Sequence, residues 1–148
     1  MKTNTAPGTR RTSTLLIAAV MAGVMTVGVG SALGEDVKVS LTGAEETPPV
    51  TTSATATGTI TIAADKSVSG TLATRGIDGT MAHIHEGAFG KSGPPIITLT
   101  KGADGTWSVP AGSKLTDDQY ASFKAGNLYV NVHSAAHMPG EIRAQLKP

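Results

Sequence analysis

The sequence predicts a mostly β protein, an antiparallel β-sandwich or barrel-like domain with one short helix near residues 116–125. Three observations predict this fold. Small and β-branched residues dominate a chain of 148 residues that has 18 glycines and few aromatic residues. Turn-forming residues recur at short intervals between runs of alternating apolar and polar residues, as in folds of many short strands. A single stretch carries the start and stop signals of a helix.

The first 34 residues have the order of a secretory signal peptide. Three basic residues stand among the first eleven, an uncharged apolar stretch follows over 15–29, and Ala32-Leu33-Gly34 forms a small-x-small cleavage signal. We therefore expect a signal peptide over 1–34 and one β domain over 35–148. The protein would be periplasmic or secreted, with no membrane span after cleavage. An uncleaved anchor is the alternative, and the export route, general or twin-arginine, stays open.

Charge and cysteine content exclude several classes of function for the expected mature chain. Residues 35–148 carry nine basic and eleven acidic side chains, a net charge of −2, without a basic cluster. We therefore expect no nucleic-acid partner. Cysteine is absent, so neither a disulfide nor a cysteine-ligated zinc or iron–sulfur site can form. The domain must be held together by packing or by a metal on other ligands.

The first strand is expected over 37–41, where apolar and polar residues alternate. Residues 45–50 form a stiff extended segment, and its two prolines place it at a sheet edge because they cannot donate to a ladder. Two further strands, over 54–63 and 67–74, flank the short turn 64–66 and form a hairpin.

The middle of the chain continues in short strands. We expect one over 81–86, then a glycine-rich loop over 87–93, and extended structure again over 95–99. A turn at Asp104-Gly105 precedes a short strand over 107–109.

The one helix has a complete set of start signals. Thr116 is its expected N-cap, Gln119 completes a capping box, and Leu115 and Tyr120 occupy the hydrophobic-staple positions. Gly126 ends it. Two strands follow, over 127–133 and 140–146.

All four histidines fall in two short windows of the sequence, His83 and His85 in one, His133 and His137 in the other. Side chains alternate between the faces of a strand, so His83 and His85 point the same way with Cβ atoms about 7 Å apart. Ile84 then faces the core. If the strands are neighbours, three of these histidines converge, and His137 reaches over from a loop.

Alternation in the last two strands gives each an apolar and a polar face. In the strand expected over 127–133, the polar face carries Tyr129, Asn131 and His133. In the strand expected over 140–146, it carries Glu141, Arg143 and Gln145. We expect the second set to face solvent, with Arg143 and Glu141 in a surface ion pair.

These patterns predict a metal site with His83, His85, His133 and His137 as ligands. Neutral imidazole suits copper and zinc, and we expect copper first and zinc second. Met138 is a candidate soft ligand. Glu86 or Glu141 is expected to accept a ring N–H. The alternative is that the histidines are hydrogen-bonded residues of a polar face.

Four segments together resemble the CHRD domain, named for its repeats in chordin and found singly in many bacterial exported proteins. They are residues 41–50 (LTGAEETPPV), 82–85 (AHIH) leading to Gly93-Pro94, 129–134 (YVNVHS) and 140–146 (GEIRAQL). The resemblance covers 37–146 and implies an extracytoplasmic β-sandwich or barrel-like domain. Thr47, Pro95 and the loop His137-Met138-Pro139 depart from the family pattern, and the last puts the fourth ligand in doubt.

Three functions compete. The leading hypothesis is an exported metal-binding protein, with copper as its first ion, that buffers or delivers the metal or carries out a redox reaction at the site. The second is a non-catalytic adhesion or matrix module that binds a protein or carbohydrate partner. The third is an enzyme of superoxide dismutase type, although most of that family's site, including its cysteines, has no counterpart in this chain. No hydrolase elbow surrounds Ser92 or Ser134, so a nucleophilic triad is not expected.

Overall fold

The computed structural model describes residues 1–4 and 34–148. The expected signal peptide lies almost entirely outside these residues, and its cleavage stays a prediction. None of the helices in the described part of the chain has the length and apolar character needed to span a membrane.

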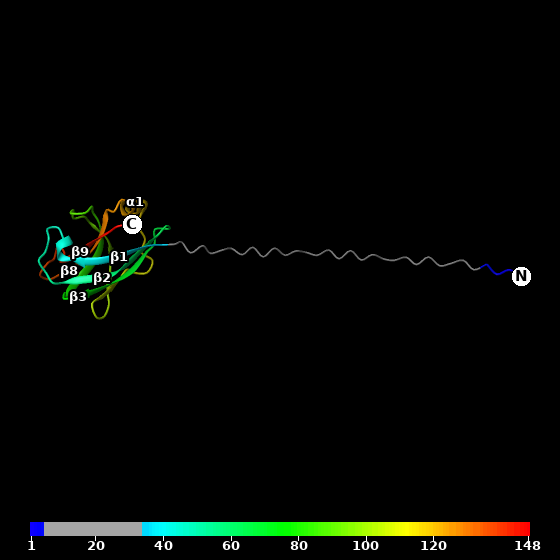
Figure 1. Ribbon diagram of the computed structural model, residues 1–148, viewed down its shortest axis with the longest axis horizontal. Helices are drawn as coiled ribbons and strands as arrows, with labels where there is room; N and C mark the ends of the chain where they lie inside the picture. Colours follow the sequence, from blue (N-terminus) through cyan, green and yellow to red (C-terminus); the bar gives the residue numbers. More distant parts are fainter. Residues whose placement is uncertain (5–33) are drawn as a thin grey trace. The chain divides into compact units, whose positions relative to one another are not determined.

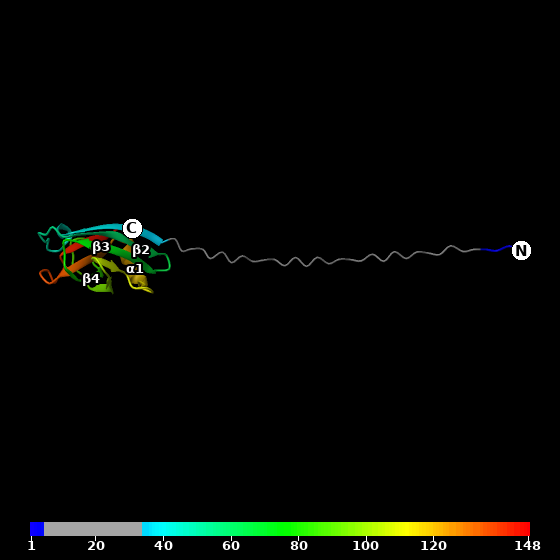
Figure 2. The ribbon, with the colours of Figure 1, turned by 90° about the horizontal axis from the view of Figure 1, so that it is seen from below.

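Residues from 34 onward form one antiparallel sheet of nine strands, in the order β5-β4-β8-β9-β1-β2-β3-β7-β6. The strands are β1 (Gly34–Thr42), β2 (Thr55–Ala63), β3 (Val68–Arg75), β4 (Gly79–Glu86), β5 (Pro95–Thr98), β6 (Thr100–Lys101), β7 (Thr106–Ser108), β8 (Leu128–Ser134) and β9 (Ile142–Leu146). A 3₁₀ turn, η1 (Gly43–Glu45), and one helix, α1 (Asp117–Lys124), complete the elements. Figures 1 and 2 show the sheet from two directions. The predicted fold class is confirmed.

The two ends of the sheet come together, so the structure is a nearly closed barrel-like sheet. Leu99, between β5 and β6, donates its amide to the carbonyl of Ala82 on β4 at 2.9 Å. Lys101 on β6 donates to the carbonyl of Gly79, also on β4, at 2.6 Å. These bonds satisfy backbone groups that open sheet edges would otherwise expose.

Strand alternation builds the core as the sequence predicts. Ile84 is fully buried, and so are the apolar alternate residues of its neighbour β8, Leu128, Val130 and Val132. From the other strands Leu41, Ile60, Leu72, Trp107, Ile142 and Leu146 join the same core. The large apolar side chains thus share one face of the sheet, which fixes the strand register because a slip of one residue would turn them outward.

Helix α1 begins with the predicted capping box. The Thr116 hydroxyl accepts from the Gln119 amide at 3.2 Å, and the Gln119 side chain accepts from the Thr116 amide at 2.9 Å. Phe123 is fully buried and anchors the helix in the core. Gly126, with φ of +72°, lies just beyond the helix, in the left-handed region that glycine enters without steric cost.

The expectation that residues 45–50 lie at a sheet edge is wrong. They belong to the connection between β1 and β2, two strands in the middle of the sheet order. The chain turns back there, because the amide of Val50 donates to the carbonyl of Gly43 at 2.8 Å. Glu46 is consequently buried, with 7% of its surface exposed.

Strands β8 and β9 are buried on both faces, which sequence alternation did not predict. Arg143 is only 1% exposed, and Glu141 and Gln145 are also buried. The expected surface ion pair between Arg143 and Glu141 is therefore wrong. Loop 87–93 and the β1–β2 connection supply polar partners to these side chains, so the polar face is covered by protein rather than by water.

A candidate metal centre of three histidines

Antiparallel pairing of β4 with β8 brings three histidines together on the outer face of the sheet. In this register His83 lies opposite Asn131, and His85 opposite Tyr129, while His133 lies opposite Met81. One ring nitrogen from each histidine lies within 4.8 Å of the other two. A single ion at the centre would reach all three nitrogens after small side-chain movements, since metal–imidazole bonds are about 2.0–2.1 Å long.

Hydrogen bonds to backbone carbonyls fix the orientation of two of the rings. Nδ1 of His85 lies 2.9 Å from the carbonyl oxygen of Gly93, and Nδ1 of His133 lies 2.8 Å from that of Met138. A carbonyl can only accept, so Nδ1 carries the proton in both rings and donates it. Each Nε2 is then left with its lone pair, the form in which histidine binds a metal.

Within the part of the chain that the structure describes, His85 Nε2 has no hydrogen-bond partner although it is buried. Asn131 Oδ1, another acceptor, is in the same condition. A buried polar group without a partner costs about 1–3 kcal/mol, so such atoms are rare in native structures. A cation bound by the three histidines would satisfy the lone pair of His85.

The third histidine, His83, bonds directly to His133. Nδ1 of His83 lies 3.0 Å from Nε2 of His133. Since His133 Nε2 is the acceptor, His83 Nδ1–H is the donor of this bond. His83 is half-buried and its ring is not held by a carbonyl, so a shift of its proton to Nε2, or a rotation of the ring, would free a third lone pair for an ion.

The surroundings of His83 and His85 lower the pKa of both rings and so favour their neutral form. Burial lowers the pKa of His83, and the nearby His133 and His85 lower it further. Burial also lowers the pKa of His85, outweighing the bond to Gly93 and the contribution of Asn131, both of which raise it. Neutral rings do not have to release a proton to water before they ligate, so metal binding faces less competition from protons.

Tyr129 supports His85 from the neighbouring strand. The two rings stack with centroids 4.8 Å apart and planes at 5°. The Tyr129 hydroxyl accepts from the amide of Gly93 at 3.1 Å, in the same residue whose carbonyl holds His85. The guanidinium of Arg143 lies 3.5 Å from the centroid of the Tyr129 ring. The ring of His85 is thus held by a stack as well as by a hydrogen bond.

Arg143 and Gln145 of β9 tie down the loop 87–93 that carries the Gly93 carbonyl. Arg143 donates to the carbonyl of Lys91 at 2.9 Å and to that of Ala88 at 3.1 Å. Gln145 donates to the carbonyl of Gly87 at 2.8 Å. Gly93 itself cannot be replaced without a shift of backbone, because a Cβ there would overlap the carbonyl of Glu86. Arg143 is therefore a positioning residue for the cluster.

Neither glutamate expected to accept a ring N–H does so. Glu86 accepts from the Ser122 hydroxyl at 2.5 Å, and Glu141 accepts from Thr52 at 2.7 Å and from Ser134. Backbone carbonyls hold the rings instead. Because every residue has a carbonyl, sequence patterns carry no signal for such partners.

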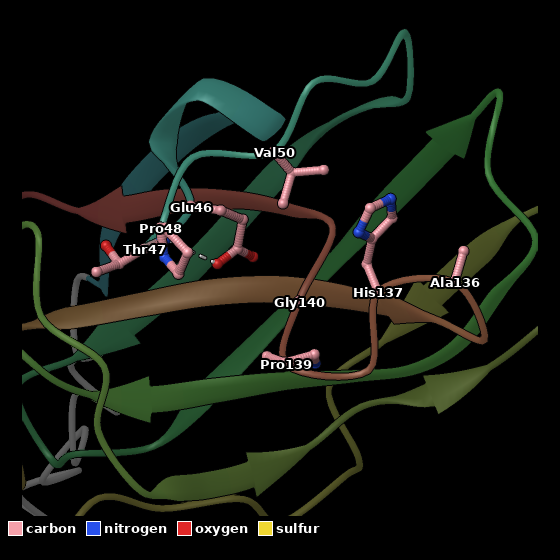
Figure 3. Close-up of a pocket in the computed structure, with 8 residues that line it drawn as sticks. All are labelled: Glu46, Thr47, Pro48, Val50, Ala136, His137, Pro139 and Gly140. Atoms are coloured by element: carbon pink, nitrogen blue, oxygen red, sulfur yellow. Dashed lines mark hydrogen bonds between the residues drawn. The ribbon is translucent and has the colours of Figure 1, made fainter.

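His137 lies apart from the other three histidines. It is on the connection between β8 and β9 and lines a cavity of about 180 Å³ together with Glu46, Thr47, Pro48 and Val50. Figure 3 shows its ring beside this cavity, across from Glu46. The side chain of Met138 is 71% exposed, and only its backbone carbonyl contacts the cluster, through His133. Three of the four candidate ligands are brought together, and the fourth is not.

Asn131 was not singled out by the sequence as a site residue, although alternation placed it on the face of His133. Its side-chain amide donates to Glu46 at 3.3 Å, and burial raises the pKa of that carboxyl. Glu46 lines the cavity of Figure 3, and Asn131 lies opposite His83 on the neighbouring strand, so the bonded pair joins the cavity to the histidine strands. In the sequence, the one sign of this link is the alternation of side chains along β8, which puts Asn131 on the same face as His133.

Comparison with known proteins gives one match. The searches of curated proteins and of solved structures gave no match. The family model of the CHRD domain matches residues 37–146, which span the whole sheet from β1 to β9 apart from a few end residues. The chain, with its nearly closed sheet and its histidines on β4 and β8, belongs to the CHRD domain family.

Proposed function

We propose that this protein is an exported copper-binding protein, periplasmic or secreted, that holds one ion through His83, His85 and His133. Two observations on His85 carry the proposal: its buried Nε2 has no hydrogen-bond partner among the described residues, and one of its ring nitrogens lies within 4.8 Å of a nitrogen of His83 and of His133. Two of the rings already present a lone pair because carbonyls hold their Nδ1–H groups.

The donor set favours copper over zinc. All three ligands are imidazole nitrogens, and for such sites copper stands above zinc in the usual order of affinity. Zinc is the second choice because it also binds three histidines and leaves a fourth position open. Oxygen-seeking ions such as Mg²⁺ and Ca²⁺ are disfavoured, since the group contains no carboxylate.

Export is supported by the amino-terminal pattern of basic start, apolar stretch and small-residue cleavage signal. It also agrees with membership of a family whose domains occur in extracellular proteins. Amino-terminal sequencing of the protein from its host should begin at or near Glu35. Full-length chain recovered from the cytosol would argue against export.

Isothermal titration of the full chain, purified without a histidine tag, tests metal binding directly. We expect one copper ion per chain, weaker binding of zinc, and a strong loss of affinity in His85→Ala. His137→Ala is the matched control, since it removes a histidine outside the cluster and should leave the affinity nearly unchanged. Equal, weak binding by wild type and His85→Ala would contradict the proposal.

One observation favours a second candidate function, a non-catalytic module for a protein or carbohydrate partner. Phe89 is 64% exposed in the glycine-rich loop 87–93, and an exposed aromatic ring is a common contact in recognition surfaces. A metal-free protein that binds cells or polymers, and loses that binding in Phe89→Ala, would support this function instead.

A further inference from the structure

Both methionines of the domain adjoin the histidine cluster. Beyond residue 33 the chain contains only Met81 and Met138. Met81 is the direct cross-strand partner of His133, and the carbonyl of Met138 accepts from the same histidine. Their side chains are 43% and 71% exposed, although large apolar side chains of this domain are otherwise mostly buried. Packing in the core therefore does not account for either methionine.

Strand geometry places the Met81 side chain next to the candidate ligands. Residues directly opposite on antiparallel strands have Cβ atoms about 4.5–5.5 Å apart and project from the same face, so Met81 stands beside His133. Met81 and His83 are two residues apart on β4 and also share this face, with Cβ atoms about 7 Å apart. A methionine side chain has three rotatable bonds and is easily redirected. Its sulfur can thus reach the space between His83 and His133.

We propose that the thioether sulfur of Met81 is a fourth ligand, which completes a site for Cu(I). This inference rests on the proposed copper-binding function and names the oxidation state that the site prefers. A thioether is a soft donor that binds Cu(I) well and adds little for zinc. Three imidazoles and one thioether give a four-coordinate set of uncharged ligands, and such a set favours the monovalent ion because less charge is left uncompensated in a partly buried site.

Met138 is the matched control because its backbone lies on the other edge of the His133 ring. Its carbonyl accepts from Nδ1, whereas the ion would bind at Nε2. Its side chain is also the more exposed of the two. Met138→Leu therefore removes a neighbouring thioether without removing a ligand.

The test is a competition for Cu(I) under anaerobic conditions between the full chain and the chelator bicinchoninate, with zinc affinity measured in parallel. Loss of an outer partner of a metal ligand already costs about 10- to 100-fold in affinity, so Met81→Leu should lower Cu(I) affinity at least about tenfold. Zinc affinity should stay the same in Met81→Leu, and both affinities should stay the same in Met138→Leu. X-ray absorption should show a sulfur neighbour of copper in wild type that is missing in Met81→Leu.

Failure of this inference and failure of the proposed function give different results. If Met81→Leu binds Cu(I) like wild type while His85→Ala binds it weakly, Met81 is not a ligand but the copper site stands. If wild type binds neither copper nor zinc and His85→Ala changes nothing, both proposals fall. Because Met81 is partly exposed and leucine has a similar volume, the variant should fold, and its metal-free thermal unfolding should match that of wild type.

Discussion

Histidine 85 shows how the surroundings of one side chain prepare it for a metal. Its Nδ1 donates to a fixed carbonyl, its ring stacks on Tyr129, and its Nε2 is buried without a partner. The hydrogen bond and the stack restrict the orientation of the ring, and the ring centroids of His83 and His133 lie 5.3 and 5.9 Å from its own. Without an ion, the Nε2 acceptor of His85 is unsatisfied, and this lowers the free energy of unfolding of the domain.

The lowered pKa values of His83 and His85 predict how stability of the metal-free protein depends on pH. In the unfolded chain both rings take up a proton near the reference pKa of about 6.5, and in the folded chain they do so only at lower pH. The unfolded state therefore binds more protons just below pH 6.5. The free energy of unfolding should be highest above that value and should fall as pH drops through the lowered pKa values.

Urea unfolding at a series of pH values measures this dependence. His85→Gln should flatten the fall between about pH 6.5 and the lowered pKa values, because glutamine has no proton to bind. Glu46 acts in the opposite sense, since its raised pKa makes the folded state hold a proton more tightly than the unfolded state above pH 4.5. An unchanged slope in His85→Gln would show that this ring is not held neutral by burial.

At the scale of the element, loop 87–93 holds the candidate ligand His85 from outside the two histidine strands. Carbonyls of this loop accept from Arg143 and Gln145 of β9, and the carbonyl of its last residue, Gly93, accepts from His85. A buried charged side chain is costly unless it is paired or hydrogen-bonded, and Arg143 donates to two carbonyls and an amide oxygen and packs on an aromatic face. The position of the loop is thereby linked to that of the candidate metal ligand.

Arg143→Lys should weaken copper binding while leaving all three histidines in place. Lysine keeps the charge but lacks the planar fork that reaches two carbonyls and stacks on a ring. We expect copper affinity to fall by about 10- to 100-fold, as for other partners that orient a ligand. Nitrogen chemical shifts of His85 should show a loss of the single Nδ1–H tautomer. Unchanged shifts with unchanged affinity would show that the loop does not need the guanidinium.

Helix α1 offers a prediction about stability that is independent of the metal. Thr116→Ala removes the hydroxyl that accepts from Gln119 and should lower the free energy of unfolding by about 1 kcal/mol. Thr116→Ser keeps the acceptor and is the control, with little expected change. Copper affinity should be the same in both variants, because the helix contributes no residue to the cluster. A loss of affinity in Thr116→Ala alone would contradict this separation.

For the whole molecule, the sequence correctly predicted which strand residues face the core. It did not predict which residues of the opposite face are covered by loops. Alternation placed Ile84 inside, and the capping residues located α1 correctly. Alternation also put His83, His85 and His133 on one face. It did not show that Arg143, Glu141 and Glu46 are buried, because their cover comes from loops whose path depends on the folded sheet. The two-residue strand β6 is too short to leave a periodic signal.

The candidate site was also only partly predictable from the sequence. The clustering of His83, His85 and His133 follows from strand register, which hydrophobic alternation constrains. Carbonyl partners such as Gly93 and the role of Tyr129 depend on how loop 87–93 returns to the sheet, which no local pattern encodes. His137 was included because it is near His133 in the sequence, but the chain turns there and carries its ring toward the cavity of Figure 3.

A bound ion should stabilise the entire domain, because its ligands come from two strands that meet only in the folded sheet. β4 and β8 are separated along the chain by β5, β6, β7 and α1. The unfolded chain does not hold the three nitrogens together, so an ion that binds only the folded state adds stability by mass action. At a free ion concentration one hundred times the dissociation constant, the gain is about 2.7 kcal/mol. Calorimetry should therefore show a rise in Tm with copper for wild type and for His137→Ala. His85→Ala should show little rise, and an equal rise in all three proteins would place the ion outside the cluster.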